Sequence, residues 1–254
     1  MHTTHRRAVE QSFHDRQAHE RSSSFDDLKS FYFTDDAYLD HETWIRPAMD
    51  RLGGVCGLSV LDYGCGHGMA AVVLARRGAR VTAFDLSPGY LHEAKRRAQC
   101  NGTSIEFVHA DAERLPFADG SFARVWGNAI LHHLDLRRAS QELDRVLLPG
   151  GIAVFCEPWG ENALLSWARR RLPYAGKERT PDEEPLCRRH LPALREVFPT
   201  LEIEGYQFLS MARRVLRPGR LVSGLEWCDA RLLRWSPSLS RFCRYVVLTL
   251  RKSA

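Results

Sequence analysis

Three glycines and an aspartate lie close together in the segment VLDYGCGHG (60–68), where an apolar stretch runs into a predicted helix. Gly64, Gly66 and Gly68 allow the backbone to approach a ligand at points where a Cβ would collide with it. The helix that follows offers free N–H groups and the positive end of its dipole. Asp62 can bind a cationic or amino group directly or through water. The segment therefore predicts a ligand-binding loop.

The spacing of these glycines differs from that of a dinucleotide-binding loop. A loop that binds NAD reads G-x-G-x-x-G before its helix. Here the last glycine position is Met69, and the pattern is G-x-G-x-G. This shorter spacing favours a ligand without a pyrophosphate.

Polar residues also stand at the ends of the next three predicted strands. Asp85 ends the second strand, where an acid can accept both hydroxyls of a ribose. Asp111 and Ala112 end the third strand, and the Asp111 carboxylate can accept the amino group of an adenine. Asn128 and Ala129 end the fourth. Because ligands of open α/β sheets bind at the carboxyl ends of the strands, these residues predict one shared site.

Alternating strands and helices must position these residues. Short apolar runs alternate with segments of about 10–15 residues that have helical periodicity, which predicts βαβ units and a parallel sheet covered on both faces. Ser87 and Pro88 form a helix start, with Ser as the N-cap. We predict strands at 58–64, 80–86, 105–111, 122–129, 152–158, 201–209 and 244–252, and helices at 68–77, 88–100 and 137–147.

Composition limits the class of protein. The 254 residues are 44% hydrophobic and 26% charged, which is ordinary for one soluble α/β domain. There are seven cysteines and no CxxC pair, so reduced thiols in a cytoplasmic protein are expected. No apolar run reaches the roughly 20 residues of a membrane span, and the polar first residues do not resemble a secretory signal.

Four segments resemble class I S-adenosylmethionine-dependent methyltransferases, in the small-molecule branch that contains ubiquinone and menaquinone methyltransferases. The resemblance implies a Rossmann-like, seven-stranded, mostly parallel sheet with helices on both faces and an antiparallel last strand. It also implies S-adenosylmethionine as the cofactor and S-adenosylhomocysteine as the product. The matching segments are VLDYGCGHG (60–68), AFDLSPGYLHEAKRRA (83–98), HADAERLPFADGSFARVWGNAILHHL (109–134) and LDRVLLPGGIAVFCEP (143–158).

The resemblance also implies a role for each residue of the predicted site. The methionine moiety meets the glycine loop, the ribose meets the end of the second strand, and adenine lies between the second and third strand ends. In chain order, the implied cofactor residues are Asp62, Gly64, Cys65, Gly66 and Gly68 (methionine), Asp85 (ribose), Leu86, Asp111 and Ala112 (adenine), and Asn128 and Ala129 (sulfonium).

Methyl transfer to oxygen or nitrogen also needs a group that removes a proton, for which histidine is suited near pH 7. His132 and His133 follow the fourth strand, and Glu157 ends the fifth, so these three are the predicted catalytic residues, with His133 favoured. The alternative is that one histidine caps a helix and the other packs. His14, His41 and Tyr38 are further candidates in the N-terminal segment, and no metal site is assigned.

The chain is expected to divide into an N-terminal helical cap (1–54) and a methyltransferase domain (55–254) with an insert at about 212–243. In the insert, one apolar helical stripe lies beside several arginines. Such a helix can bind an anionic membrane or line a pocket for an amphiphilic substrate. The alternative is that the stripe packs against the sheet and the arginines are solvated. The stripe consists of Leu221, Leu225, Cys228, Leu232 and Trp235.

The expected acceptor is a small organic molecule, such as a lipid, a quinone or a specialised metabolite, methylated at O, N or C. Nucleic acid is not expected as a partner, because Asn128-Ala129-Ile130-Leu131 lacks the prolines of an amino-directed DNA methyltransferase turn. A protein methyltransferase and a cofactor-binding partner subunit without activity remain alternatives. The sequence does not predict an oligomeric state.

Overall fold

One seven-stranded sheet forms the centre of the molecule in the computed structural model, which describes residues 2–22, 31–171, 184–217 and 219–254. The strand order is β3-β2-β1-β4-β5-β7-β6, and only β7 runs antiparallel to its neighbours. This confirms the predicted fold class. The strands are β1 Ser59–Tyr63, β2 Arg80–Asp85, β3 Glu106–His109, β4 Phe122–Asn128, β5 Leu147–Pro158, β6 Glu202–Tyr206 and β7 Tyr245–Arg251.

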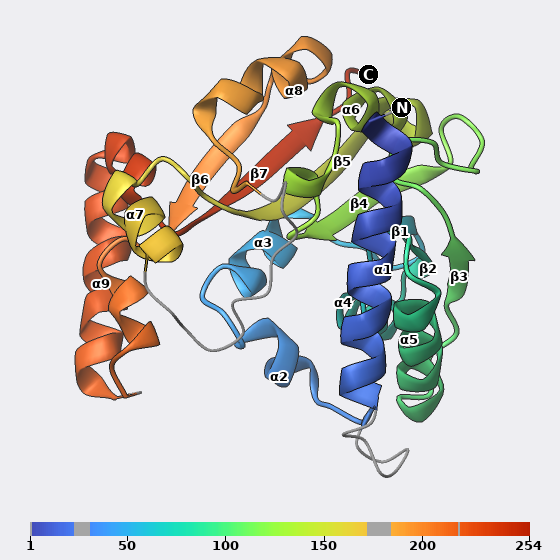
Figure 1. Ribbon diagram of the computed structural model, residues 1–254, viewed down its shortest axis with the longest axis horizontal. Coiled ribbons are helices and arrows are strands. Elements are labelled where there is room, and N and C mark those ends of the chain that lie inside the picture. The colour runs from blue at the N-terminus through green and yellow to red at the C-terminus, as the bar shows by residue number, and fades with distance from the viewer. Residues whose placement is uncertain (1, 23–30, 172–183, 218) are drawn as a thin grey trace.

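Helices cover both faces of the sheet, as Figure 1 shows. On one face α3 and α4 pack against the sheet, and on the other α6 and α8 do so, each with its own apolar core. β1 contributes to both cores, which explains its continuous apolar run. The α-helices are α1 His2–Ser22, α2 Asp35–Leu39, α3 Ile45–Arg51, α4 Met69–Arg76, α5 Pro88–Cys100, α6 Leu136–Val146, α7 Ala163–Arg171, α8 Leu191–Val197 and α9 Arg220–Trp235.

α1 packs along α5, so the first residues form an ordered helix beside the sheet (Figure 1). The Asp15 carboxylate of α1 accepts hydrogen bonds from the Ser87 hydroxyl and, at 3.2 Å, from the Gly89 N–H. Tyr90 donates its hydroxyl to Gln17 at 2.9 Å. An acid at a helix N-terminus satisfies N–H groups that have no partner within the helix. These contacts hold α1 across the start of α5.

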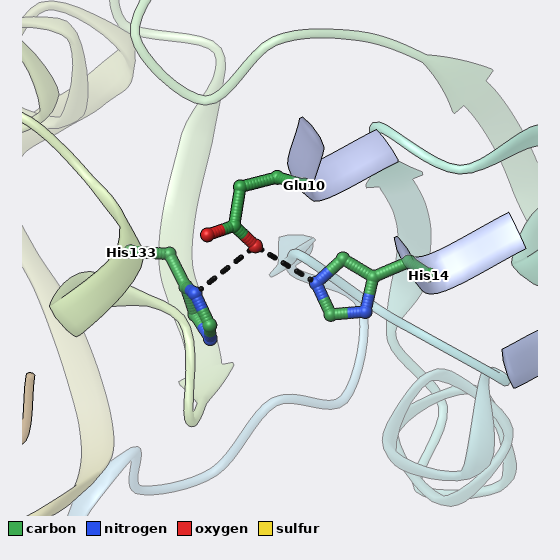
Figure 2. A group of neighbouring side chains, drawn as sticks. All are labelled: Glu10, His14 and His133. Atoms are coloured by element: carbon green, nitrogen blue, oxygen red, sulfur yellow. Dashed lines mark ion pairs between the residues drawn. The ribbon is translucent and has the colours of Figure 1, made fainter. Parts of the chain in front are cut away.

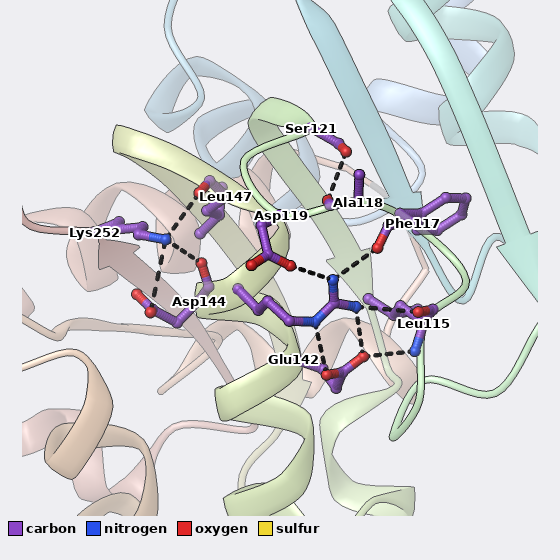
Figure 3. Close-up of polar contacts among 10 residues, drawn as sticks. Leu115, Phe117, Ala118, Asp119, Ser121, Glu142, Asp144, Leu147 and Lys252 are labelled. Carbon is purple, nitrogen blue, oxygen red and sulfur yellow. Dashed lines mark hydrogen bonds and ion pairs between the residues drawn. The ribbon is translucent and has the colours of Figure 1, made fainter.

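Arg145 of α6 holds the loop before β4 in place, and Figure 3 shows the residues that it binds, Leu115, Phe117, Asp119 and Glu142. Its guanidinium donates to the carbonyl oxygens of Leu115 and Phe117, and it pairs with the carboxylates of Asp119 and Glu142. The five donors of an arginine suit such a set of acceptors. The loop that carries the end of β3 into β4 is thereby held against α6.

β5 begins five residues earlier than predicted. α6 ends at Val146, and the strand already starts at Leu147, so the Pro149-Gly150-Gly151 segment lies inside it. The pairing with β4 shifts register between Phe122 and Arg124, which is typical of a β-bulge. A Cβ at Gly151 would lie 2.7 Å from the Leu148 carbonyl oxygen, so glycine is required for this turn within the strand.

α9 does not bury its predicted apolar stripe against the sheet. Leu221 and Trp235 are exposed, and the three residues between them are half-buried. The helix is anchored instead through Val222 and Asp229, which are buried. The Asp229 carboxylate accepts the N–H groups of residues 208, 209 and 210. Within the described part of the chain, no helix combines the length and the apolar character needed to cross a membrane.

Gly66 and Gly68, two of the three glycines in the loop before α4, differ in what surrounds them. Gly68 has φ +80°, and a Cβ there would lie 2.7 Å from the Cβ of Ala94 in α5. Gly66 has φ +49°, and nothing lies within 4 Å of a Cβ built there. The loop therefore needs glycine at position 68 for both backbone conformation and packing, and at position 66 for backbone conformation alone.

We expect Gly68→Ala to lower the free energy of unfolding by about 2–4 kcal/mol, because it adds overpacking to backbone strain. The matched variant Gly66→Ala should cost only about 1 kcal/mol. Denaturant unfolding of both variants measures the difference. Equal losses would contradict the close α4–α5 contact.

Candidate active site

A cavity of about 340 Å³ lies at the carboxyl ends of β1, β2 and β4, and α1 contributes to its wall. It brings together most of the predicted residues: Asp62, Gly64, Cys65, Gly66, Asp85, Leu86, Asp111, Ala112, Asn128, Ala129 and His133. The lining does not include three predicted residues, Gly68, His132 and Glu157. It also does not include His41, whereas His14 and Tyr38 take part.

Asp62 is a buried carboxyl group at the end of β1, with 2% of its surface exposed. Its Oδ2 has no hydrogen-bond partner among the described residues, although the residue lines the cavity. Burial raises the pKa of Asp62 to about 8, while the Ala71 N–H lowers it and the charge of Asp85 adds to the increase. The side chain is therefore placed to accept a cationic donor that enters the cavity.

Asp85, at the end of β2, ties the glycine loop to α5. One carboxylate oxygen accepts the N–H of Gly66 at 2.8 Å, and the other accepts the N–H of Ser87 at 2.9 Å. Burial raises the pKa of Asp85, and these two N–H groups oppose that rise. Because a carboxylate offers about four acceptor positions, it can still accept hydroxyl groups of a ligand.

The end of β3 forms another part of the wall. Asp111 accepts the N–H of Glu113 at 2.9 Å, which shapes the turn after the strand. The Tyr63 hydroxyl donates to the carbonyl oxygen of Ala112 at 2.7 Å and fixes that peptide from beneath the sheet. Glu113 in turn accepts the N–H of Asp135 at 2.8 Å. The wall is thus held by bonds from two other elements.

The chain turns sharply after β4. Ala129 has φ +57°, an uncommon conformation for a residue with a Cβ. Its N–H donates to the carbonyl oxygen of Cys156 at 2.8 Å. A Cβ at Gly64 would lie 2.8 Å from Ile130, so the turn packs directly against the glycine loop. Backbone strain of this kind is often found at functional sites.

Glu157 supports this turn from behind. Its carboxylate accepts the N–H groups of Ile130 at 3.0 Å and Leu131 at 2.8 Å. The other oxygen lies 2.7 Å from the Nδ1 atom of His132. Glu157 and the His132 side chain are both buried. In this arrangement the two residues hold the segment between β4 and α6 in place.

His133, in the short 3₁₀ helix Leu131–His133, faces the cavity. Its Nδ1 atom lies 3.2 Å from the Glu10 carboxylate of α1, and His14 lies 3.5 Å from the same oxygen. Burial lowers the pKa of His14, but the carboxylates of Glu10 and Asp85 more than offset this, and the net shift is upward. Sequence reasoning missed Glu10. Its spacing of four residues from His14 was the available signal.

Residues 61–155 match a protein family described as methyltransferase domain. This segment is therefore similar to that domain. It carries the glycine loop, the ends of β1 to β4 and the turn that contains His133.

A curated relative supports the assignment of the methyltransferase domain. The demethylmenaquinone methyltransferase of Clavibacter sepedonicus is 38% identical over 140 residues, which cover 54% of this chain and 57% of the relative. The chain therefore matches less than two thirds of that relative's length.

Solved structures extend the likeness of the fold beyond the methyltransferase domain. The [4+2]-cyclase SpnF has a TM-score of 0.56 at 25% identity and covers 82% of this chain and 79% of its own. The geranyl diphosphate C-methyltransferase of Streptomyces coelicolor A3(2), solved with Mg²⁺, geranyl diphosphate and S-adenosyl-L-homocysteine, has a TM-score of 0.55 at 20% identity. It covers 82% of this chain and 77% of its own. At 20% identity, the likeness of the second structure concerns the fold alone.

We expect Asp62→Asn to raise the melting temperature of the ligand-free protein by several degrees at pH 7. The Asp62 pKa rises from about 3.9 when unfolded to about 8 when folded. Stability is therefore lost as pH rises between these values. Each pKa unit corresponds to about 1.4 kcal/mol, and Asn avoids this penalty.

Scanning calorimetry at pH 5 and pH 8 measures this effect. The advantage of the Asp62→Asn variant over the wild type should grow with pH. A constant difference, or a loss of stability at both values, would contradict the raised pKa.

Proposed function

We propose that the chain is an S-adenosylmethionine-dependent methyltransferase that acts on a small organic acceptor. The observation that carries this proposal is the unpartnered Oδ2 of Asp62, buried in the cavity beside the glycine loop. A buried carboxylate oxygen calls for a charged donor, and the amino group of the cofactor is one. The similarity of residues 61–155 to the methyltransferase domain supports the same cofactor.

The other predicted cofactor residues fit the same ligand. Gly64 and Gly66 line the cavity where we place the methionine moiety. Asp85 retains acceptor positions for the ribose hydroxyls. We assign adenine to Leu86, Asp111 and Ala112, and the sulfonium side to the backbone of Asn128 and Ala129. Cys65, in the same loop, lines the cavity. Gly68 allows the loop to pack closely against Ala94 of α5.

His133 is the predicted catalytic residue that reaches the acceptor side of the cavity. When bound, the cofactor supplies an electrophilic methyl group. The protein aligns the acceptor with that group, excludes water and assists the loss of the acceptor's proton. We assign the removal of the acceptor's proton to the part of the cavity wall that contains His133. Glu157 and His132 are positioning residues that hold the turn before it.

We further propose an amphiphilic acceptor and contact with an anionic membrane surface through α9. Large apolar side chains are exposed along this part of the chain, including Val215, Trp227 and Trp235. The Arg231 guanidinium lies 3.9 Å above the Trp227 ring. Aromatic and basic side chains on one helix are typical of binding at a lipid interface.

Use of the fold for a reaction other than methyl transfer is the second candidate. The likeness to the [4+2]-cyclase SpnF raises this candidate, since it covers as much of this chain as the likeness to the C-methyltransferase does. A protein acceptor is a further alternative. All of these candidates bind the cofactor. They differ in whether the methyl group is transferred and in the acceptor that receives it.

We expect the protein to bind S-adenosylmethionine and to release close to one proton at pH 7. A carboxyl group with a pKa of about 8 is mostly protonated at this pH, and a cationic partner selects the carboxylate. Calorimetric titration in two buffers of different ionisation enthalpy measures the released proton. Asp62→Asn should abolish the release and weaken binding at least about tenfold.

Asp85→Ala should also weaken binding at least about tenfold, whereas the exposed control variant Asp50→Asn should bind as the wild type does. No binding by a folded wild type would overturn the proposal.

Transfer of a labelled methyl group to a panel of quinone, lipid and hydroxylated acceptors then tests the reaction. Binding without transfer to any acceptor would favour the second candidate.

The membrane contact predicts that the protein co-sediments with phosphatidylglycerol vesicles and not with phosphatidylcholine vesicles. The double variant Trp227→Ser with Trp235→Ser should reduce the bound fraction at least about fivefold, since it removes the apolar part of the contact. Tyr32→Ser, an equally exposed aromatic position away from α9, is the matched control. Equal sedimentation of both variants would contradict the contact.

A further inference from the structure

Glu10, His14 and His133 form a compact cluster on the cavity wall, as Figure 2 shows. Glu10 and His14 are four residues apart on α1, so they lie on the same face of the helix. His133 comes from the turn after β4. In Figure 2 the Glu10 carboxylate lies between the two imidazole rings.

The distances within this cluster approach those between the ligands of a single ion. Glu10 Oε2 lies 3.2 Å from His133 Nδ1 and 3.5 Å from His14 Nε2. The three ligand atoms all lie within 4.8 Å of one another. Metal bonds of about 2.0–2.2 Å place neighbouring ligand atoms roughly 3.0–3.5 Å apart. The two pairs that include Glu10 already fall within or at the edge of this range.

The environment also suits a cation. The Glu10 and His133 side chains are 9% and 12% exposed, and His14 is 26% exposed, so the cluster is sheltered but reachable from the cavity. Asp85 adds negative charge close to His14. Two imidazoles and one carboxylate select transition metals, whereas Mg²⁺ and Ca²⁺ prefer oxygen ligands alone.

We propose that Glu10, His14 and His133 bind one divalent transition-metal ion on the wall of this cavity. Three protein ligands leave coordination positions for an oxygen atom that enters the cavity, as in catalytic metal sites. Such an ion lowers the pKa of a bound hydroxyl group. Activation of a methyl acceptor's hydroxyl group by the ion rests on the proposed function, whereas binding of the ion does not.

Titration of chelator-treated protein with Co²⁺, followed by its visible absorption spectrum, tests the site without cofactor or acceptor. We expect one ion per chain, displaced by Zn²⁺. Glu10→Gln, His14→Gln and His133→Asn should each weaken binding at least about tenfold. His19→Gln, an exposed histidine on the same helix, is the matched control and should bind as the wild type does.

Two results would overturn the site: no Co²⁺ binding by the wild type, or binding that the three variants do not weaken more than His19→Gln. If His133→Asn does not fold, the more exposed His14→Gln decides the question alone. The same chelator-treated protein is titrated with S-adenosylmethionine, so failure of the metal site and failure of the proposed function are read separately.

Discussion

The Asp85 carboxylate is the interaction on which the rest of the site depends. It joins the Gly66 N–H of the loop after β1 to the Ser87 N–H at the start of α5. Two βα units are thereby held in one relative position at the edge of the sheet. A charged acceptor makes such hydrogen bonds stronger than neutral ones. The cavity between the units keeps its shape because this one side chain serves both.

The same helix start also carries α1. Asp15 binds at Ser87 and Gly89, next to the residue that Asp85 holds. α1 therefore reaches the cavity through the element that also shapes the cofactor loop. Contacts between adjacent elements thus connect the loop to α1, which carries Glu10 beside His133.

Burial of Asp62 lowers the stability of the folded protein. Burial shifts its pKa to about 8, so the ligand-free protein is less stable near neutral pH than it would be with a neutral side chain there. Ala129, after the neighbouring strand β4, adds a strained backbone. Natural proteins commonly hold strained or poorly satisfied groups at functional sites, where a ligand supplies the missing interaction.

Local pattern determined the central part of this protein. The glycine spacing, the acids at strand ends and the alternation of apolar runs were enough to predict the parallel part of the sheet, the Ser87 helix cap and the acids around the cavity, whereas the antiparallel last strand came from the family resemblance. Each of these features depends on residues that are neighbours in sequence, and parallel strands bring their ends together by geometry.

Tertiary structure alone decided the rest. Glu157, predicted as a catalytic residue, accepts the N–H groups of the turn after β4 and does not line the cavity. The start of β5 is set by its irregular pairing with β4. Glu10 meets His133 only because α1 docks on α5, a contact between distant segments that no periodicity records.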